Sequence, residues 1–317
     1  MRRLTKKKEK KILTKEEFEE QFNRKREKAI MRFKEFEPEE GYFLCFSGGK
    51  DSQTIYHLAK QAGVKFDAHY SVTSVDPPEL IHFIKNNYPD VIFDLPRYPD
   101  GTRISMWNLI PKELTPPTRF IRYCCGALKE SNGEGRLVVT GVRWAESNSR
   151  RAKNDAVKII GKPKKTQKMA DELDINYRKP NEDSIVFNDD NDEARRMIEN
   201  CYRTRKTILN PIVEWEEEDV WYYLNNVAKV PHCCLYDEGQ TRLGCIGCPM
   251  ASEKEKTREL ERYPKFKEAY IRAFERMLKG REEAGKVNNA IGMYSKKGNC
   301  LHDWSTAQDV YDFWIQQ

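Results

Sequence analysis

The sequence lacks any apolar run long enough to cross a membrane. Of its 317 residues, 38% are hydrophobic and 33% are charged, a balance typical of a polar, soluble protein. The chain is long enough for one large or two medium domains with a real core. Residues 1–11 contain no apolar segment of the kind that a signal peptide needs. We therefore expect a cytoplasmic protein with no membrane partner.

Other familiar patterns are also missing. The spacing of a Walker P-loop does not occur, no histidine stands at zinc-finger spacing, and no internal repeat is visible. A reducing cytoplasm argues against structural disulfides, although the chain has nine cysteines. Clustered cysteines in that compartment indicate metal or redox chemistry instead.

What the chain does contain is a loop rich in glycine and serine, Ser47-Gly48-Gly49-Lys50-Asp51-Ser52. A strand-like apolar run, 42–46, precedes it, and apolar residues at helical spacing follow it at 55–62. The amides at the start of such a helix, together with its dipole, favour an anion. Paired glycines let backbone approach a phosphate closely, and Lys50 adds a cation. The loop predicts a phosphate site; the alternative is a plain strand–turn–helix connection.

The rest of the chain alternates strand-like and helical patterns. We expect a charged helix before residue 40, strands at 66–72, 91–94 and 137–140, and a helix after Pro77-Pro78. Further helices are expected near 217–227 and 253–283, and the polar segment 145–200 reads as a long loop. Such alternation predicts an α/β fold, a parallel sheet flanked by helices, with a mainly helical C-terminal region that contains cysteines.

The predicted organisation has three parts: a basic tail and charged helix at 1–40, a nucleotide-binding domain at 41–215 and a helical region at 216–317. Ligands of parallel sheets bind beyond the carboxyl ends of the strands. Ser47 and Gly141 both follow such ends, so we expect the two loops to face one site.

A cysteine pair stands in the C-terminal third, in the run Cys245-Ile246-Gly247-Cys248-Pro249. Two thiolates at this spacing can bind one metal centre, and Gly247 permits the tight turn. Zinc sites and iron–sulfur clusters need four ligands, and the pairs Cys124-Cys125 and Cys233-Cys234 could supply the others. A redox pair, a zinc site near His232 and reduced cysteines without metal are the alternatives.

The remaining cysteines are weaker candidates. Cys45 falls inside the first predicted strand and reads as a core residue. Cys201 and Cys300 are isolated, and we expect neither to be a ligand.

Together these pieces resemble the phosphoadenosine phosphosulfate (PAPS) reductase family, whose fold is the PP-loop α/β domain of the adenine nucleotide alpha hydrolases. The resemblance extends over residues 41–250 in order and spacing. Four segments carry it: Ser47–Ser52; Arg122-Tyr123-Cys124-Cys125-Gly126-Ala127-Leu128-Lys129; Thr140-Gly141-Val142-Arg143-Trp144-Ala145-Glu146-Ser147 with Arg150; and Leu209–Pro249 with its Leu235-Tyr236-Asp237-Glu238-Gly239 and Cys245–Pro249 motifs.

The resemblance implies roles for these residues. The nucleotide-binding set would be Ser47, Gly48, Gly49, Lys50, Asp51, Ser52, Gly141, Arg143 and Arg150, with Lys50, Asp51 and Arg143 as the catalytic residues. In the iron–sulfur branch of the family, two cysteine pairs hold a 4Fe–4S cluster; here they would be Cys124, Cys125, Cys245 and Cys248. Relatives in DNA phosphorothioation use a cysteine where Cys234 stands, which could therefore replace Cys124 or Cys125.

The intact Ser47–Ser52 loop bears on the reaction. Sulfonucleotide reductases of this family bind a substrate that already carries its sulfate, and their loops lose parts of the motif. Here Lys50 and the loop amides can neutralise a leaving pyrophosphate, and Asp51 can help to place Mg²⁺. We therefore expect an ATP pyrophosphatase-type enzyme that cleaves ATP at the α-phosphate in sulfur-related chemistry.

Two other functions stay open. A sulfonucleotide reductase carries its nucleophilic cysteine in a Cys-Gly-Leu-His tail, which is absent here, although Asn299-Cys300-Leu301-His302 is a faint echo of it. A non-catalytic nucleotide-binding adaptor is the third hypothesis.

Charge patterning bears on partners beyond the adenine nucleotide. The net charge is +6, and basic residues concentrate in 1–15 and 150–168, whereas 182–193 is acidic. Such runs are usually solvated faces or loose tails; the alternative is contact with a nucleic acid backbone. We expect a nucleic acid or a sulfur-donor protein as the further partner, and leave a homo-oligomer open.

Overall fold

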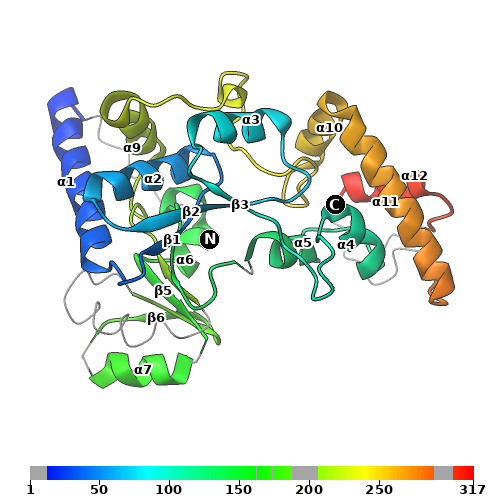
Figure 1. The fold of residues 1–317 in the computed structure, drawn as a ribbon, viewed down its shortest axis with the longest axis horizontal. Coiled ribbons are helices and arrows are strands. Elements are labelled where there is room, and N and C mark those ends of the chain that lie inside the picture. Colours follow the sequence, from blue (N-terminus) through cyan, green and yellow to red (C-terminus); the bar gives the residue numbers. More distant parts are fainter. Residues whose placement is uncertain (1–12, 131, 162, 173–174, 188–205, 289–302) are drawn as a thin grey trace, which may run out of the picture. The chain divides into compact units, whose positions relative to one another are not determined.

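The computed structural model describes residues 13–130, 132–161, 163–172, 175–187, 206–288 and 303–317. These residues form the helices and strands drawn in Figure 1. None of the helices in those ranges combines the length and the apolar character needed to cross a bilayer.

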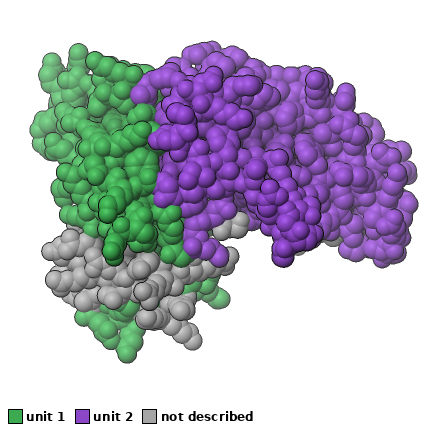
Figure 2. Space-filling view, viewed as in Figure 1, with its two compact units in different colours: residues 1–42, 54–66, 135–229 green, residues 43–53, 67–134, 230–317 purple. Residues whose placement is uncertain are grey.

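The chain divides into two compact units that each combine distant segments (Figure 2). Unit 1 contains residues 1–42, 54–66 and 135–229, and unit 2 contains residues 43–53, 67–134 and 230–317. The predicted three-part division at residues 40 and 215 remains a prediction.

Unit 2 carries the first three predicted strands, in the order β3-β2-β1. They are β1 (Tyr42–Cys45), β2 (Phe66–Ser71) and β3 (Ile92–Asp94), and β2 and β3 pair in parallel. Helix α2 (Lys50–Ala62) follows β1, and α3 (Pro78–Asn87) follows β2, with Pro78 in its first turn. The predicted alternation of strand and helix is confirmed here. The short apolar runs form strands, and the segments with apolar residues at helical spacing form helices.

Unit 1 holds the remaining strands, in the order β4-β8-β5-β7-β6. Strands β4 (Leu137–Val139) and β8 (Lys206–Leu209) are parallel, whereas β5 (Val157–Ile160), β7 (Ser184–Phe187) and β6 (Arg178–Asn181) are antiparallel additions. Helices α6 (Asn148–Lys153) and α7 (Pro163–Glu172) lie in the same stretch. The prediction of a long loop over 145–200 was therefore wrong for its described part, because strands of four residues are too short to show periodicity.

The charged helix predicted before residue 40 is α1 (Lys15–Glu35). Its N-terminus is fixed by a capping box, in which Thr14 and Glu17 satisfy each other's backbone amides. Phe22 and Phe33 are buried, and the Phe22 ring contacts Trp215 at 5.6 Å between centroids. The thin apolar stripe thus anchors α1 within unit 1. The same unit contains α9 (Glu217–Tyr222) and the π-helical turn η3 (Tyr223–Ala228).

The C-terminal region is helical, as predicted, and its part from residue 230 onward belongs to unit 2. The single helix expected at 253–283 is two helices, α10 (Glu253–Arg262) and α11 (Pro264–Glu283), because Pro264 cannot continue the hydrogen-bond ladder. In Figure 1 they gather with α4 (Met106–Glu113), α5 (Tyr123–Cys125) and α12 (Ala307–Ile315) around an aromatic core. The fold is α/β with parallel strands flanked by helices, plus this helical region.

Candidate functional site

The glycine-rich loop lies between β1 and α2, at the predicted carboxyl end of a strand. Helix α2 begins at Lys50, so the loop delivers its backbone to a helix N-terminus. Gly48 has φ of +71°, and a Cβ there would come within 2.8 Å of side-chain atoms of Leu80 and Ile84 in α3. Only glycine fits this conformation and this contact.

Lys50 is the buried cation of this loop, with 5% of its surface exposed. Its ammonium donates a hydrogen bond to the carbonyl of Thr241 at 2.9 Å and lies 3.8 Å from the carboxylate of Asp51. Its backbone amide donates to the hydroxyl of Tyr236 at 2.9 Å. Sequence reasoning assigned no role to Tyr236 or Thr241, since nothing local marks a chain segment almost two hundred residues away as a neighbour of this loop.

The two serines brace the loop. The hydroxyl of Ser52 donates to the carbonyl of Gly49 at 2.8 Å, and Ser47 donates to Ser52 at 3.1 Å. Ser47 is exposed while Ser52 is buried. The loop therefore forms an N-terminal turn that gathers backbone amides, one lysine and one exposed hydroxyl, which are the kinds of group that bind an anion.

The other predicted nucleotide residues lie in unit 1, just after β4. Gly141 is half-buried, and Arg143 is 2% exposed. The Arg143 guanidinium pairs with Glu217 at 2.8 Å, while its backbone amide donates to Glu146, which also binds Arg150 at 2.8 Å. These contacts fix the turn η2 (Trp144–Glu146). Contact of Gly141, Arg143 or Arg150 with a nucleotide stays a prediction, as does their juxtaposition with the glycine-rich loop in unit 2.

Four predicted ligand cysteines occur together in unit 2. Cys124 is buried, and Cys125, Cys245 and Cys248 are half-buried. A hydrogen bond with Cys125, burial and the charges of all three other thiols raise the pKa of Cys124. The same hydrogen bond is the main cause that lowers the pKa of Cys125 to about 6. The charges of the thiols thus affect one another, and Cys125 ionises more easily than Cys124.

Lys129 and Asp76 complete the charge balance around Cys245. Desolvation by nearby protein atoms disfavours the charged form of Lys129. The charges of Cys245 and Asp76 outweigh this effect and raise the pKa of Lys129. Cys245 also donates to the hydroxyl of Thr73 at 3.6 Å. An ammonium held beside thiols stabilises their thiolate forms, which are the forms that bind metals.

The Cys245–Cys248 turn is shaped by the C-terminal helices. Gly247 has φ of +68°, and a Cβ there would lie 2.7 Å from the ring of Trp314 and 3.1 Å from that of Tyr270. Tyr270 donates its hydroxyl hydrogen to the carbonyl of Ile246 at 2.9 Å. The tight turn expected from Gly247 is present, and aromatic side chains far along the chain press against it.

Within the described ranges, no three or more histidine, cysteine, aspartate or glutamate side chains are arranged to hold a metal ion. Cys234 is exposed, and its described thiol neighbour is the buried Cys233. Cys45 is half-buried within β1. Cys201 and Cys300 lie outside the described residues, so the candidate nucleophile of a reductase is not described.

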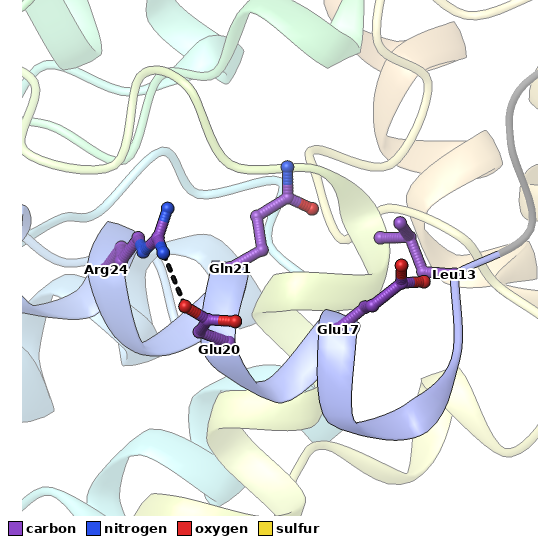
Figure 3. A pocket seen from close by; sticks show the side chains of 5 residues that line it. All are labelled: Leu13, Glu17, Glu20, Gln21 and Arg24. Carbon is purple, nitrogen blue, oxygen red and sulfur yellow. Dashed lines mark hydrogen bonds and ion pairs between the residues drawn. The ribbon is translucent and has the colours of Figure 1, made fainter.

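A separate pocket of about 240 Å³ lies on the first turns of α1 (Figure 3). Leu13, Glu17, Glu20, Gln21 and Arg24 line it, and Arg24 pairs with Glu20. None of the predicted site residues contributes to it. We read it as a solvated helix face.

The sequence is similar to a known domain family and to known proteins. The model of the phosphoadenosine phosphosulfate reductase domain matches residues 41–251. An uncharacterized protein of Methanocaldococcus jannaschii is 34% identical over 80% of this chain and 44% of its own length; a second from the same organism is 23% identical over 81% and 54%. The chain thus spans about half the length of these curated relatives.

Solved structures were also matched. The FMN adenylyltransferase of Candida glabrata aligns with a TM-score of 0.41 and 15% identity, over 75% of this chain and 66% of that one. The PAPS reductase of Candida auris, in a phosphate complex, aligns with a TM-score of 0.41 and 13% identity, over 74% of this chain and 96% of that one.

Proposed function

The chain belongs to the phosphoadenosine phosphosulfate reductase domain family, and from this premise we propose that it binds ATP at the Ser47–Ser52 loop and cleaves it at the α-phosphate. The fold is that of the adenine nucleotide alpha hydrolases, and the family is one of nucleotide-using proteins. The cleavage itself, its acceptor and its cofactors are the proposal.

One observation carries the proposal: the complete loop stands at the N-terminus of α2, with the buried Lys50 beside it. Burying an ammonium is costly unless charge or hydrogen bonds compensate it. The carbonyl of Thr241 and the carboxylate of Asp51 supply that compensation here. A pyrophosphate leaving group would take over from the Thr241 carbonyl, and amides at the helix start would bind its oxygens. Such groups act where negative charge develops, which is how an enzyme lowers the barrier of phosphoryl or nucleotidyl transfer.

The reaction is a substitution at the α-phosphorus of ATP. An oxygen of the acceptor forms the new bond to phosphorus, while the bond from phosphorus to the bridging oxygen breaks and its electron pair leaves with pyrophosphate. Lys50 and the loop amides stabilise the departing charge. Asp51 would help to hold Mg²⁺, which would neutralise phosphate charge when bound. Arg143 or Arg150 would contact the anionic end of the substrate, as the family resemblance implies.

The test is incubation of the purified chain with ATP and Mg²⁺ and quantification of AMP or adenylylated product and of pyrophosphate. We expect Lys50→Ala to lower the rate about 100-fold or more, the scale of losing one group that stabilises a transition state. Lys60→Ala, in the last turn of the same helix, is the matched control and should keep the rate. Tight ATP binding without turnover would instead indicate the non-catalytic adaptor.

We further propose that Cys124, Cys125, Cys245 and Cys248 hold a 4Fe–4S cluster. The chemistry of the donor set supports this, since the charges of Cys125, Cys245 and Cys248 all act on Cys124 and Lys129 offsets thiolate charge. When bound, the cluster would either shape the pocket or carry electrons. The choice of Cys124 and Cys125 over Cys234 is supported by the coupling of Cys124 to Cys245 and Cys248.

Cluster removal tests this assignment. Protein purified without oxygen should be brown, with absorbance near ~400 nm from thiolate-bound iron. Cys245→Ser should lose most of that absorbance and of the bound iron. Cys234→Ser is the decisive control: retained iron supports the proposed ligands, and loss of iron would move the assignment to Cys234. A colourless wild-type protein that contains zinc would refute the cluster.

The further partner is proposed to be a nucleic acid or a sulfur-donor protein. The basic run at 150–168 supports an anionic partner, because it gathers lysine and arginine side chains whose charges would pair with phosphates. Lysines whose charges repel one another gain from a bound phosphate.

A further inference from the structure

We infer that Tyr236 gates the glycine-rich loop, its hydroxyl standing where a phosphate oxygen binds. The inference rests on the proposed function, since the displaced ligand is the phosphate of the nucleotide. The amide of Lys50 donates to the Tyr236 hydroxyl at 2.9 Å, and a Cβ on Gly49 would lie 3.3 Å from the same oxygen. The hydroxyl therefore lies against the loop backbone, on an amide that would bind the anion.

Lys50 is held by the same gate. Its ammonium donates to the carbonyl of Thr241 at 2.9 Å and lies 5.6 Å from the centre of the Tyr236 ring. Both partners belong to the segment 236–241, which we call the gate segment. Two groups that would receive phosphate, one amide and one ammonium, are thus each satisfied by this segment.

The gate segment is anchored at one end and turns at the other. Leu235 and Cys233 are fully buried, and the Tyr236 amide donates to the carbonyl of Cys233 at 3.0 Å. Gly239 has φ of +84°, and a Cβ there would meet nothing within 4 Å. A buried stem and an open glycine turn allow the segment to swing without repacking the core.

An ion-pair latch holds the gate segment at its tip. Arg262 of α10 pairs with Glu238 in the gate segment and, at 3.0 Å, with Glu79 of α3. The Arg262 hydrogen bond lowers the pKa of Glu238, so the carboxylate stays charged. Tyr263 adds a hydrogen bond to Glu79 at 2.9 Å. The latch is exposed, so it biases the gate segment rather than locking it.

The competition favours phosphate over the hydroxyl. A single amide hydrogen makes one strong hydrogen bond, so the phenol and the phosphate exclude each other. A charged phosphate oxygen accepts roughly twice as strongly as a neutral hydroxyl. The Lys50 amide therefore has a partner in the hydroxyl when no anion is bound, and a phosphate oxygen displaces that hydroxyl.

Binding of inorganic pyrophosphate to the full chain, measured by calorimetry, tests the gate. Tyr236→Phe removes only the competing hydroxyl, and we expect binding about fivefold tighter, the scale of one net neutral hydrogen bond. Arg262→Gln should act in the same direction by about twofold. Tyr88→Phe is the matched control, because the Tyr88 hydroxyl accepts from Gln53 of the same helix and should leave affinity unchanged.

Unchanged or weaker binding by Tyr236→Phe would overturn the gate while leaving the proposed function standing. Absence of binding in wild type and in every variant would overturn the proposed function itself. Hydrogen exchange of the Lys50 amide tests its contact with the Tyr236 hydroxyl independently. Tyr236→Phe should accelerate this exchange several-fold, and an unaltered exchange rate would mean that the hydroxyl does not cover the loop.

Discussion

At the scale of single residues, two glycines set the geometry of the two candidate sites. Gly48 and Gly247 both have positive φ, and both back directly onto side chains of packed helices. Each combines a backbone conformation that other residues rarely adopt with a contact that leaves no room for a Cβ. The motifs therefore depend on glycine for packing as well as for flexibility.

Gly48→Ala separates these two requirements. We expect it to lower the free energy of unfolding by about 2–3 kcal/mol, from backbone strain and from contact with Leu80 and Ile84. Gly101→Ala, at φ of +85° with open space around it, should cost only the strain, about 1 kcal/mol. Urea unfolding of both variants measures the difference. Equal losses of unfolding free energy would mean that Leu80 and Ile84 of α3 move aside for the added Cβ without cost.

At the scale of elements, the C-terminal helices shape the Cys245–Cys248 turn. Trp314 of α12 is fully buried, its indole nitrogen donates to the carbonyl of Pro117 at 2.9 Å, and its own carbonyl accepts from Lys256 of α10 at 2.8 Å. Its ring packs at a tilt against that of Tyr270 of α11, at 4.4 Å between centroids. Three helices thus converge on one turn, which explains why a helical region follows the nucleotide-binding sequence.

Trp314→Ala should destabilise the chain by about 3–5 kcal/mol, because it leaves a large cavity in this aromatic core. It should also release iron faster than wild type when a chelator is added, since the turn at Gly247 loses its support. Trp221→Ala, on the half-buried face of α9 in unit 1, is the control and should leave iron release unchanged. Equal release rates for the two variants would show that α12 does not support the turn.

At the scale of the whole molecule, both candidate sites in unit 2 are assembled from distant parts of the chain. The glycine-rich loop and the segment that covers it are separated by almost two hundred residues, and so are Lys50 and Thr241. A ligand that binds such a site stabilises every segment that forms it. Stability and binding are therefore linked through mass action.

ATP at about 100 times its dissociation constant should stabilise the native chain by about 2.7 kcal/mol. Thermal unfolding with and without ATP and Mg²⁺ measures this as a rise in Tm. Lys50→Ala should show little rise, while Lys60→Ala should match wild type. A full rise in Lys50→Ala would place the nucleotide somewhere other than the glycine-rich loop.

The candidate sites were partly visible in the sequence. The loop at 47–52, the strand before it and the helix after it follow from composition and period, which are local properties. The Cys245–Cys248 turn follows from spacing for the same reason. The antiparallel strands β5, β6 and β7 were missed, because four-residue strands in polar surroundings carry too few apolar positions to define a period.

The sequence by itself determined the α/β alternation and marked one loop as a candidate phosphate site, since both depend on neighbours along the chain. Only the tertiary structure decided what covers that loop and what surrounds the cysteines. Tyr236 and Lys129 act through space, on partners that the fold selects. Hydrogen bonds and charges between distant segments leave no local pattern, so their chemistry becomes visible only once the chain has folded.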